Sequence, residues 1–91
     1  MQAAVRSYVR ESIEKMTGNR VPEECDDDTP LGYGGLELES LYLMELTVQV
    51  EREYGVNLGL DLAELPGYTI GDLVRRVSGV AEGRPGSESR P

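Results

Sequence analysis

The sequence predicts an all-α protein: a small bundle of three main helices plus one short helix, with a long loop between the first two main helices. Apolar side chains recur at three- and four-residue spacing within residues 3–16, 40–54 and 69–81. Every proline lies outside these segments, and no stretch alternates between apolar and polar residues for long enough to form a convincing strand. A chain of 91 residues has room for one domain with a small core.

The first helix is predicted over residues 3–16. Its apolar positions follow helical spacing and are Val5, Tyr8, Val9, Ile13 and Met16. Gly18 follows shortly after this segment and is a plausible stop, because glycine readily adopts the left-handed conformation that ends helices. The sequence therefore predicts about four turns of helix near the start of the chain.

Residues 17–39 show no helical pattern and are interrupted by prolines and glycines. A structureless loop of this length is unusual in a compact domain unless it is functional or packed. We therefore expect apolar side chains to fix it to the core. The candidates are Leu31, Tyr33, Leu36 and Leu38.

The strongest helix is predicted over residues 40–54, which contain no proline or glycine and precede Gly55. Two apolar stripes run along it. The stripe expected to face the core consists of Leu43, Leu46, Val50 and Tyr54. The second stripe consists of Leu41, Met44 and Val48. Because a helix in so short a chain is hard to bury all round, we expect the second stripe at the surface. The alternative is that it packs under the loop at residues 17–39.

A short helical turn is expected over residues 61–65, before Pro66 and Gly67. The last helix is predicted to begin at Thr69, which resembles a capping box together with Asp72. Its apolar stripe is Ile70, Leu73, Val74 and Val77. Residues 82–91 are rich in glycine, proline, serine and charge, so a flexible tail is expected there.

Charge and composition narrow the functional classes. The net charge of −8 would be repelled by phosphate backbones, so no nucleic-acid partner is expected. No run of about 18 apolar residues is present, and the first residues lack the apolar stretch of a secretory signal. We therefore expect a cytoplasmic protein without membrane contact. The single cysteine, Cys25, excludes an internal disulfide.

The acidic residues of the loop do not predict a metal site. Asp26, Asp28 and Glu37 fall at positions one, three and twelve of a possible calcium loop. Pro30 at position five supplies no side-chain oxygen, and Leu31 at position six replaces the glycine that the sharp turn requires. We therefore expect no bound metal.

Ser40 carries the most functional information. Its hydroxyl stands at the predicted start of the apolar helix, after a glycine-bearing loop and between Glu39 and Leu41. A serine there can anchor a covalent group on a rigid element, or it can serve only as an N-cap. The G-x-S-x-G motif of a hydrolase nucleophile is absent, and the chain has no histidine. Because Ser-His-Asp and Cys-His mechanisms both need that histidine, we expect no enzymatic activity.

Three segments of the chain resemble the acyl and peptidyl carrier proteins. They are Leu38-Glu39-Ser40-Leu41, the run from Met44-Glu45-Leu46 to Glu51-Arg52-Glu53-Tyr54-Gly55-Val56, and Tyr68-Thr69-Ile70-Gly71-Asp72-Leu73-Val74. The first segment is similar to the Asp-Ser-Leu sequence that opens the family's second helix. The second is similar to the apolar-Glu-Leu sequence that follows, and to the acidic pair, aromatic residue and glycine after it. The third is similar to the family's closing Thr-apolar-x-Asp-Leu sequence. The resemblance extends over about residues 3–81. Glu39 replaces the usual Asp, and Arg52 stands where the family commonly has an acid.

The resemblance implies that a phosphopantetheinyl transferase moves 4′-phosphopantetheine from coenzyme A onto Ser40. The protein would then shuttle thioester-bound acyl or aminoacyl groups between a loading enzyme and downstream synthase or transferase enzymes. Residues 1–81 would form the carrier domain, as a monomer. Because Arg52 departs from the family pattern, we expect a polyketide, nonribosomal peptide or related antibiotic pathway rather than generic fatty-acid synthesis.

The second stripe and nearby acids are the expected contact surface for these partners. Its residues are Glu39, Leu41, Met44, Glu45, Val48 and Glu51. Methionine adapts its shape to several surfaces, and the acids would meet basic groups on partners. The alternative function is a small helical interaction domain without a prosthetic group, in which Ser40 is only a cap.

Overall fold

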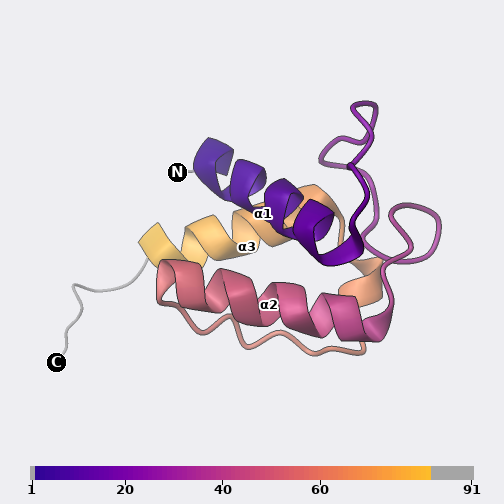
Figure 1. Cartoon of the computed structure of the whole chain (residues 1–91). Coiled ribbons are helices and arrows are strands. Elements are labelled where there is room, and N and C mark those ends of the chain that lie inside the picture. Colours follow the sequence, from indigo (N-terminus) through magenta and orange to yellow (C-terminus); the bar gives the residue numbers. More distant parts are fainter. Residues whose placement is uncertain (1, 83–91) are drawn as a thin grey trace, which may run out of the picture.

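Three α-helices form the bundle in the computed structural model, which describes residues 2–82 (Figure 1). They are α1 (Gln2–Thr17), α2 (Ser40–Tyr54) and α3 (Ile70–Glu82). The 3₁₀ helix η1 (Leu65–Gly67) precedes α3. Within residues 2–82, strand-like pairing is limited to one isolated antiparallel bridge between Pro30 and Thr69. The all-α prediction is confirmed.

The bounds of α1 and α3 differ from the predicted ones by one residue at each end, and the short helix follows the predicted turn. Residues 62–64 form the predicted turn, in which the Glu64 and Leu65 N–H groups donate to the Asp61 carbonyl, and the 3₁₀ helix then begins at Leu65 with Pro66 inside it. Proline fits there because the first helical positions need no N–H donor. Glu82, expected to begin the tail, ends α3. The rest of the expected tail lies outside the described residues.

The core forms where α1 packs against both α2 and α3. From α2 it receives Leu43, Leu46 and Val50, which are all buried, as the first stripe predicted. The Tyr54 ring meets the Tyr8 ring of α1 edge-on, with centroids 5.8 Å apart and an interplanar angle of 89°. Gly55 ends α2 in the left-handed conformation, at φ 64°. The buried stripe fixes the rotation of α2 about its axis and therefore decides which side chains it presents to solvent.

The loop over residues 18–39 is anchored by part of the predicted set. Leu31 and Leu38 are buried, and Leu36 packs against the core while partly exposed. The prediction is wrong for Tyr33, whose side chain is 92% exposed. The reason is a tight turn in which the Gly35 N–H donates to the Gly32 carbonyl, 3.2 Å away, and leaves Tyr33 at its outer edge.

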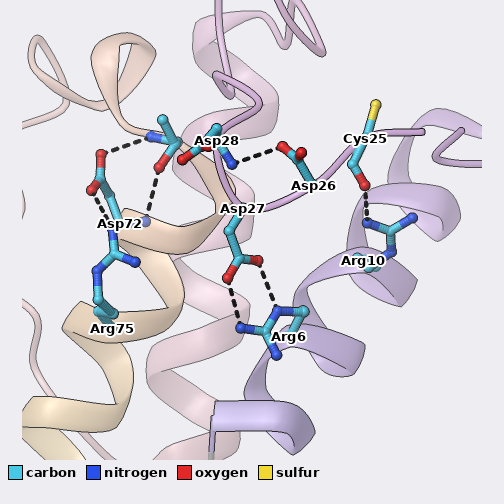
Figure 2. Close-up of polar contacts among 9 residues, drawn as sticks. Arg6, Arg10, Cys25, Asp26, Asp27, Asp28, Asp72 and Arg75 are labelled. Atoms are coloured by element: carbon cyan, nitrogen blue, oxygen red, sulfur yellow. Dashed lines mark hydrogen bonds and ion pairs between the residues drawn. The ribbon is translucent and has the colours of Figure 1, made fainter. Parts of the chain in front are cut away.

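Polar contacts fix the same loop to two helices (Figure 2). The Arg6 guanidinium of α1 donates two hydrogen bonds to the Asp27 carboxylate, at 2.8 and 2.7 Å. Arg10 donates to the carbonyl of Cys25 at 3.1 Å. The Asp27 carbonyl in turn accepts a 2.8 Å hydrogen bond from the N–H of Gly71 on α3. Asp27 therefore links α1, the loop and α3.

The predicted capping box begins α3. The Thr69 N–H donates to the Asp72 carboxylate, and the Asp72 N–H donates to the Thr69 hydroxyl, both at 3.0 Å. The first hydrogen bond is the main reason why the pKa of Asp72 lies below its ordinary value of 3.8. Aspartate can replace the usual glutamate because its carboxylate still reaches the Thr69 N–H.

The Arg6–Asp27 pair predicts a pH-dependent contribution to stability. Hydrogen bonding to Arg6 lowers the pKa of Asp27 below its ordinary value of 3.8. A carboxyl with a lowered folded-state pKa stabilises the fold above its unfolded-state pKa, and this stabilisation is lost as pH falls through the folded-state value. Asp27→Asn is therefore expected to be less stable than wild type near neutral pH, with the difference closing below pH 3.8. Urea denaturation across this range measures it.

The control for that experiment is Asp28→Asn. Within residues 2–82, Asp28 forms no ion pair, whereas Asp27 does. The Asp28 variant should therefore follow the wild-type stability at each pH. If Asp27→Asn did the same, the Arg6–Asp27 pair would contribute nothing to the pH dependence of folding.

Candidate functional site

Ser40 is the first helical residue of α2, and Glu39 occupies the N-cap position with φ −71° and ψ 161°. The Glu39 side chain forms no capping hydrogen bond. The alternative in which Ser40 serves as the N-cap is therefore wrong. Ser40 lies one position inside the helix, where its hydroxyl is not needed to close the first turn.

The Ser40 side chain is exposed and has no hydrogen-bond partner among residues 2–82. The first intrahelical hydrogen bond runs from the Leu43 N–H to the Glu39 carbonyl, at 3.0 Å. The N–H groups of the three preceding residues, from Ser40 to Tyr42, therefore have no carbonyl partner within the helix. Together these features present a free hydroxyl beside free N–H donors.

Such a position suits an esterified phosphate. Its anion would be favoured by the free N–H groups and the helix dipole, an effect of about 0.3–1 kcal/mol at an exposed site. The nearest charged side chain in the sequence is that of Glu39, which is exposed, so solvent screens its repulsion. Ser40 and the first turn of α2 thus fit a covalently attached phosphodiester.

The second stripe of α2 lies at the surface. Leu41 is 59% exposed, Met44 is 45% exposed and Val48 is 42% exposed. The alternative that the loop covers this stripe is therefore wrong. Leu41 directly follows Ser40, so the apolar stripe begins beside the free hydroxyl and continues along α2.

A shallow groove of about 270 Å³ accompanies this stripe. It is lined by Met44, Glu45, Val48, Gln49 and Arg52. Gln49 and Arg52 were not among the predicted site residues. Helical spacing could have found them, because positions four residues apart share one face of a helix. A search for regularly spaced apolar residues does not find them, because both are polar.

The predicted acidic residues divide into two groups. Glu39 and Glu45 are exposed, as a partner surface requires. The Glu51 carboxylate instead accepts a 2.8 Å hydrogen bond from the Leu58 N–H. It therefore fixes the segment after α2 against the helix while Glu51 stays partly exposed, and its contact with partners remains a prediction.

No metal centre forms among residues 2–82. No group of three or more histidine, cysteine, aspartate or glutamate side chains there is placed to hold an ion. Asp26, Asp28 and Glu37 in particular are not brought together as a ligand set. Within the same residues, no helix is both long enough and apolar enough to cross a bilayer.

Comparison with known proteins gives one family match. The model for the phosphopantetheine attachment site matches residues 7–77. No curated protein and no solved structure matches the chain significantly. The matched region contains α2 with Ser40 at its start, together with most of α1 and α3. The chain therefore belongs to the phosphopantetheine-attachment family of acyl and peptidyl carrier proteins, which are not enzymes and bear 4′-phosphopantetheine covalently on a serine.

Proposed function

We propose that Ser40 is the attachment serine and that the protein shuttles acyl or aminoacyl groups between biosynthetic enzymes. The observation that carries this proposal is the exposed Ser40 hydroxyl at the first position of α2. Two other serines lie in the matched region. Ser12 is buried, and Ser7 lies in the second turn of α1, away from a helix N-terminus.

The attachment chemistry needs only a hydroxyl from this chain. The Ser40 oxygen would attack the coenzyme A phosphorus nearest the pantetheine, and the phosphoanhydride bond would break. Adenosine 3′,5′-bisphosphate would leave, and the serine proton would pass to a base on the transferase. Once attached, the arm supplies a terminal thiol that carries acyl groups as thioesters. The role of Ser40 is to hold that tether on a rigid helix, which keeps the cargo at high effective concentration near a docked partner.

The exposed stripe and the acidic character of the chain support docking to enzymes. An apolar patch on a small protein usually marks a contact site, and a net charge of −8 favours partners with basic surfaces. The proposed contacts are Glu39, Leu41, Met44, Glu45, Val48 and Glu51. We place the protein in the cytoplasm as a monomer, with residues 1–81 as the carrier domain.

The groove beside the second stripe of α2 supports a proposal for the class of biosynthetic pathway. Arg52, which replaces a common family acid, lines this groove together with Met44 and Val48. A cation there would repel the basic groups that an acidic carrier surface usually meets. This supports partners in a polyketide, nonribosomal peptide or related antibiotic pathway rather than in generic fatty-acid synthesis.

The function is tested by incubating the intact chain with coenzyme A and a broad-specificity phosphopantetheinyl transferase. Intact-mass spectrometry should show a gain of one phosphopantetheinyl group. If no transferase modified the chain, and partner binding were insensitive to Ser40, a small helical interaction domain would explain the fold better.

The Met44→Arg substitution tests the contact surface. Met44 is 45% exposed, so the change should leave the helical circular dichroism spectrum and the melting temperature unchanged. A charged side chain at the centre of the stripe should remove the apolar contact that Met44 offers to a partner. We expect the transferase kcat/KM to fall about tenfold, the size typical of losing an interface anchor.

Met44→Leu is the matched control, because it keeps the volume and apolar character of the side chain. It should react like wild type. Unfolding of the Met44→Arg variant would show that the stripe belongs to the core, and an unchanged reaction rate would remove Met44 from the contact surface.

A further inference from the structure

The turn before α2 presents an aromatic side chain that the fold does not use. Tyr33 is 92% exposed, the most exposed of the large hydrophobic side chains described. It stands between Gly32 and Gly34, in the turn that the Gly35 N–H closes onto the Gly32 carbonyl, and α2 begins at Ser40. Because the ring buries almost nothing, it contributes little to folding stability.

The backbone around Tyr33 is held firmly. The Gly32 N–H donates to the Pro66 carbonyl of η1 at 3.2 Å, and the Gly32 carbonyl accepts from the Glu37 N–H at 2.8 Å. The approach to η1 is close, since a Cβ on Gly32 would lie 2.8 Å from the Pro66 carbonyl oxygen. A Cβ on Gly35 would collide with the Pro30 carbonyl. The turn is therefore fixed, and little ordering entropy would be lost when its exposed ring meets a partner.

The distance between Tyr33 and Ser40 is limited by the short chain that joins them. The hydrogen bond between Gly32 and Glu37 joins the two sides of the turn, and only three further residues lead from Glu37 to Ser40. At 3.3–3.6 Å per residue, the two Cα atoms are at most roughly 18 Å apart. A standard protein interface covers about 800 Å² on each partner and is roughly 30 Å across. A partner that covers Ser40 can therefore also cover Tyr33.

We propose that Tyr33 is a contact residue for the phosphopantetheinyl transferase, an inference that rests on the proposed function of Ser40. The transferase must bring phosphorus within bonding distance of the Ser40 oxygen, so its surface has to lie over the start of α2. Enzymes that act later meet the thiol at the end of a long arm and need not reach the turn that carries Tyr33.

The residues around Tyr33 indicate what surface the transferase would need in order to bind here. Glu37 and Glu39 are exposed in the segment that leads to Ser40. The transferase would offer an apolar recess for the ring and basic groups for these acids. Tyrosine suits such a contact, because it brings a large rigid ring at low entropic cost.

The test compares initial rates of modification for wild type, Tyr33→Ala and Tyr33→Phe with one transferase and coenzyme A. Tyr33→Ala should lower kcat/KM about tenfold, as truncation of an aromatic anchor typically does. Tyr33→Phe keeps the ring and should retain the wild-type rate. All three should share one melting temperature, and prolonged incubation should modify all of them completely.

The outcomes separate this inference from the function of Ser40. Equal rates for Tyr33→Ala and wild type would overturn the Tyr33 contact while leaving the carrier function intact. Equal losses in Tyr33→Phe and Tyr33→Ala would overturn the assignment of the contact to the ring. A lower melting temperature for Tyr33→Ala would show a folding role instead. Failure of wild type to react would refute the function itself.

Discussion

The Ser40→Ala variant is expected to gain no phosphopantetheinyl group under conditions that convert the wild-type chain completely. The methyl group of alanine offers no oxygen to attack the phosphorus of coenzyme A, so the loss should be total. The fold should survive, because Ser40 is exposed and its hydroxyl has no hydrogen-bond partner among residues 2–82. Intact-mass spectrometry measures the modification, and circular dichroism measures the fold.

Ser7→Ala is the matched control for that experiment. Ser7 is also exposed and lies in the matched region, but it is in the second turn of α1. Its replacement should leave the modification unchanged. A Ser40→Ala chain that still gained the full mass would refute the assignment, and loss of the modification in Ser7→Ala would move the attachment site to α1.

The sequence predicted the parts of the fold that depend on local pattern. Helical periodicity identified α1, α2 and α3, and the spacing of Thr69 and Asp72 identified the capping box that begins α3. Both signals lie within a few consecutive residues, where backbone geometry decides which side chains meet. The separation of the two α2 stripes was predictable for the same reason.

The parts that the sequence did not predict depend on contacts between distant residues. Nothing near Asp27 in the chain indicates that its carboxylate meets Arg6 or that its carbonyl meets Gly71. The outward position of Tyr33 depends on the packing of the Gly32 turn against η1, which periodicity cannot describe. Glu51 was predicted as a partner contact beside the stripe, and its hydrogen bond with the Leu58 N–H is a tertiary contact that local pattern does not indicate.

The Leu46→Ala variant should be strongly destabilised, whereas Leu41→Ala should be close to wild type. Both remove the same atoms from the same helix, so the change in helix propensity is similar. Leu46 is 1% exposed and Leu41 is 59% exposed. Truncating the buried leucine loses its transfer free energy and leaves a cavity, at a cost of about 3 kcal/mol. The exposed leucine should change the free energy of unfolding by less than about 0.5 kcal/mol.

Thermal denaturation separates these two expectations clearly. In a domain of this size, about 3 kcal/mol corresponds to a fall in melting temperature of roughly 12–24 °C. The orientation of α2 about its own axis links folding to function. Because this orientation buries Leu46 in the core, it leaves Leu41 at the surface beside Ser40. If Leu41→Ala were destabilised as much as Leu46→Ala, the second stripe would be part of the core. Met44 and Val48 would then lose their proposed role, and partners would have to recognise Ser40 through its acidic neighbours and the turn before α2.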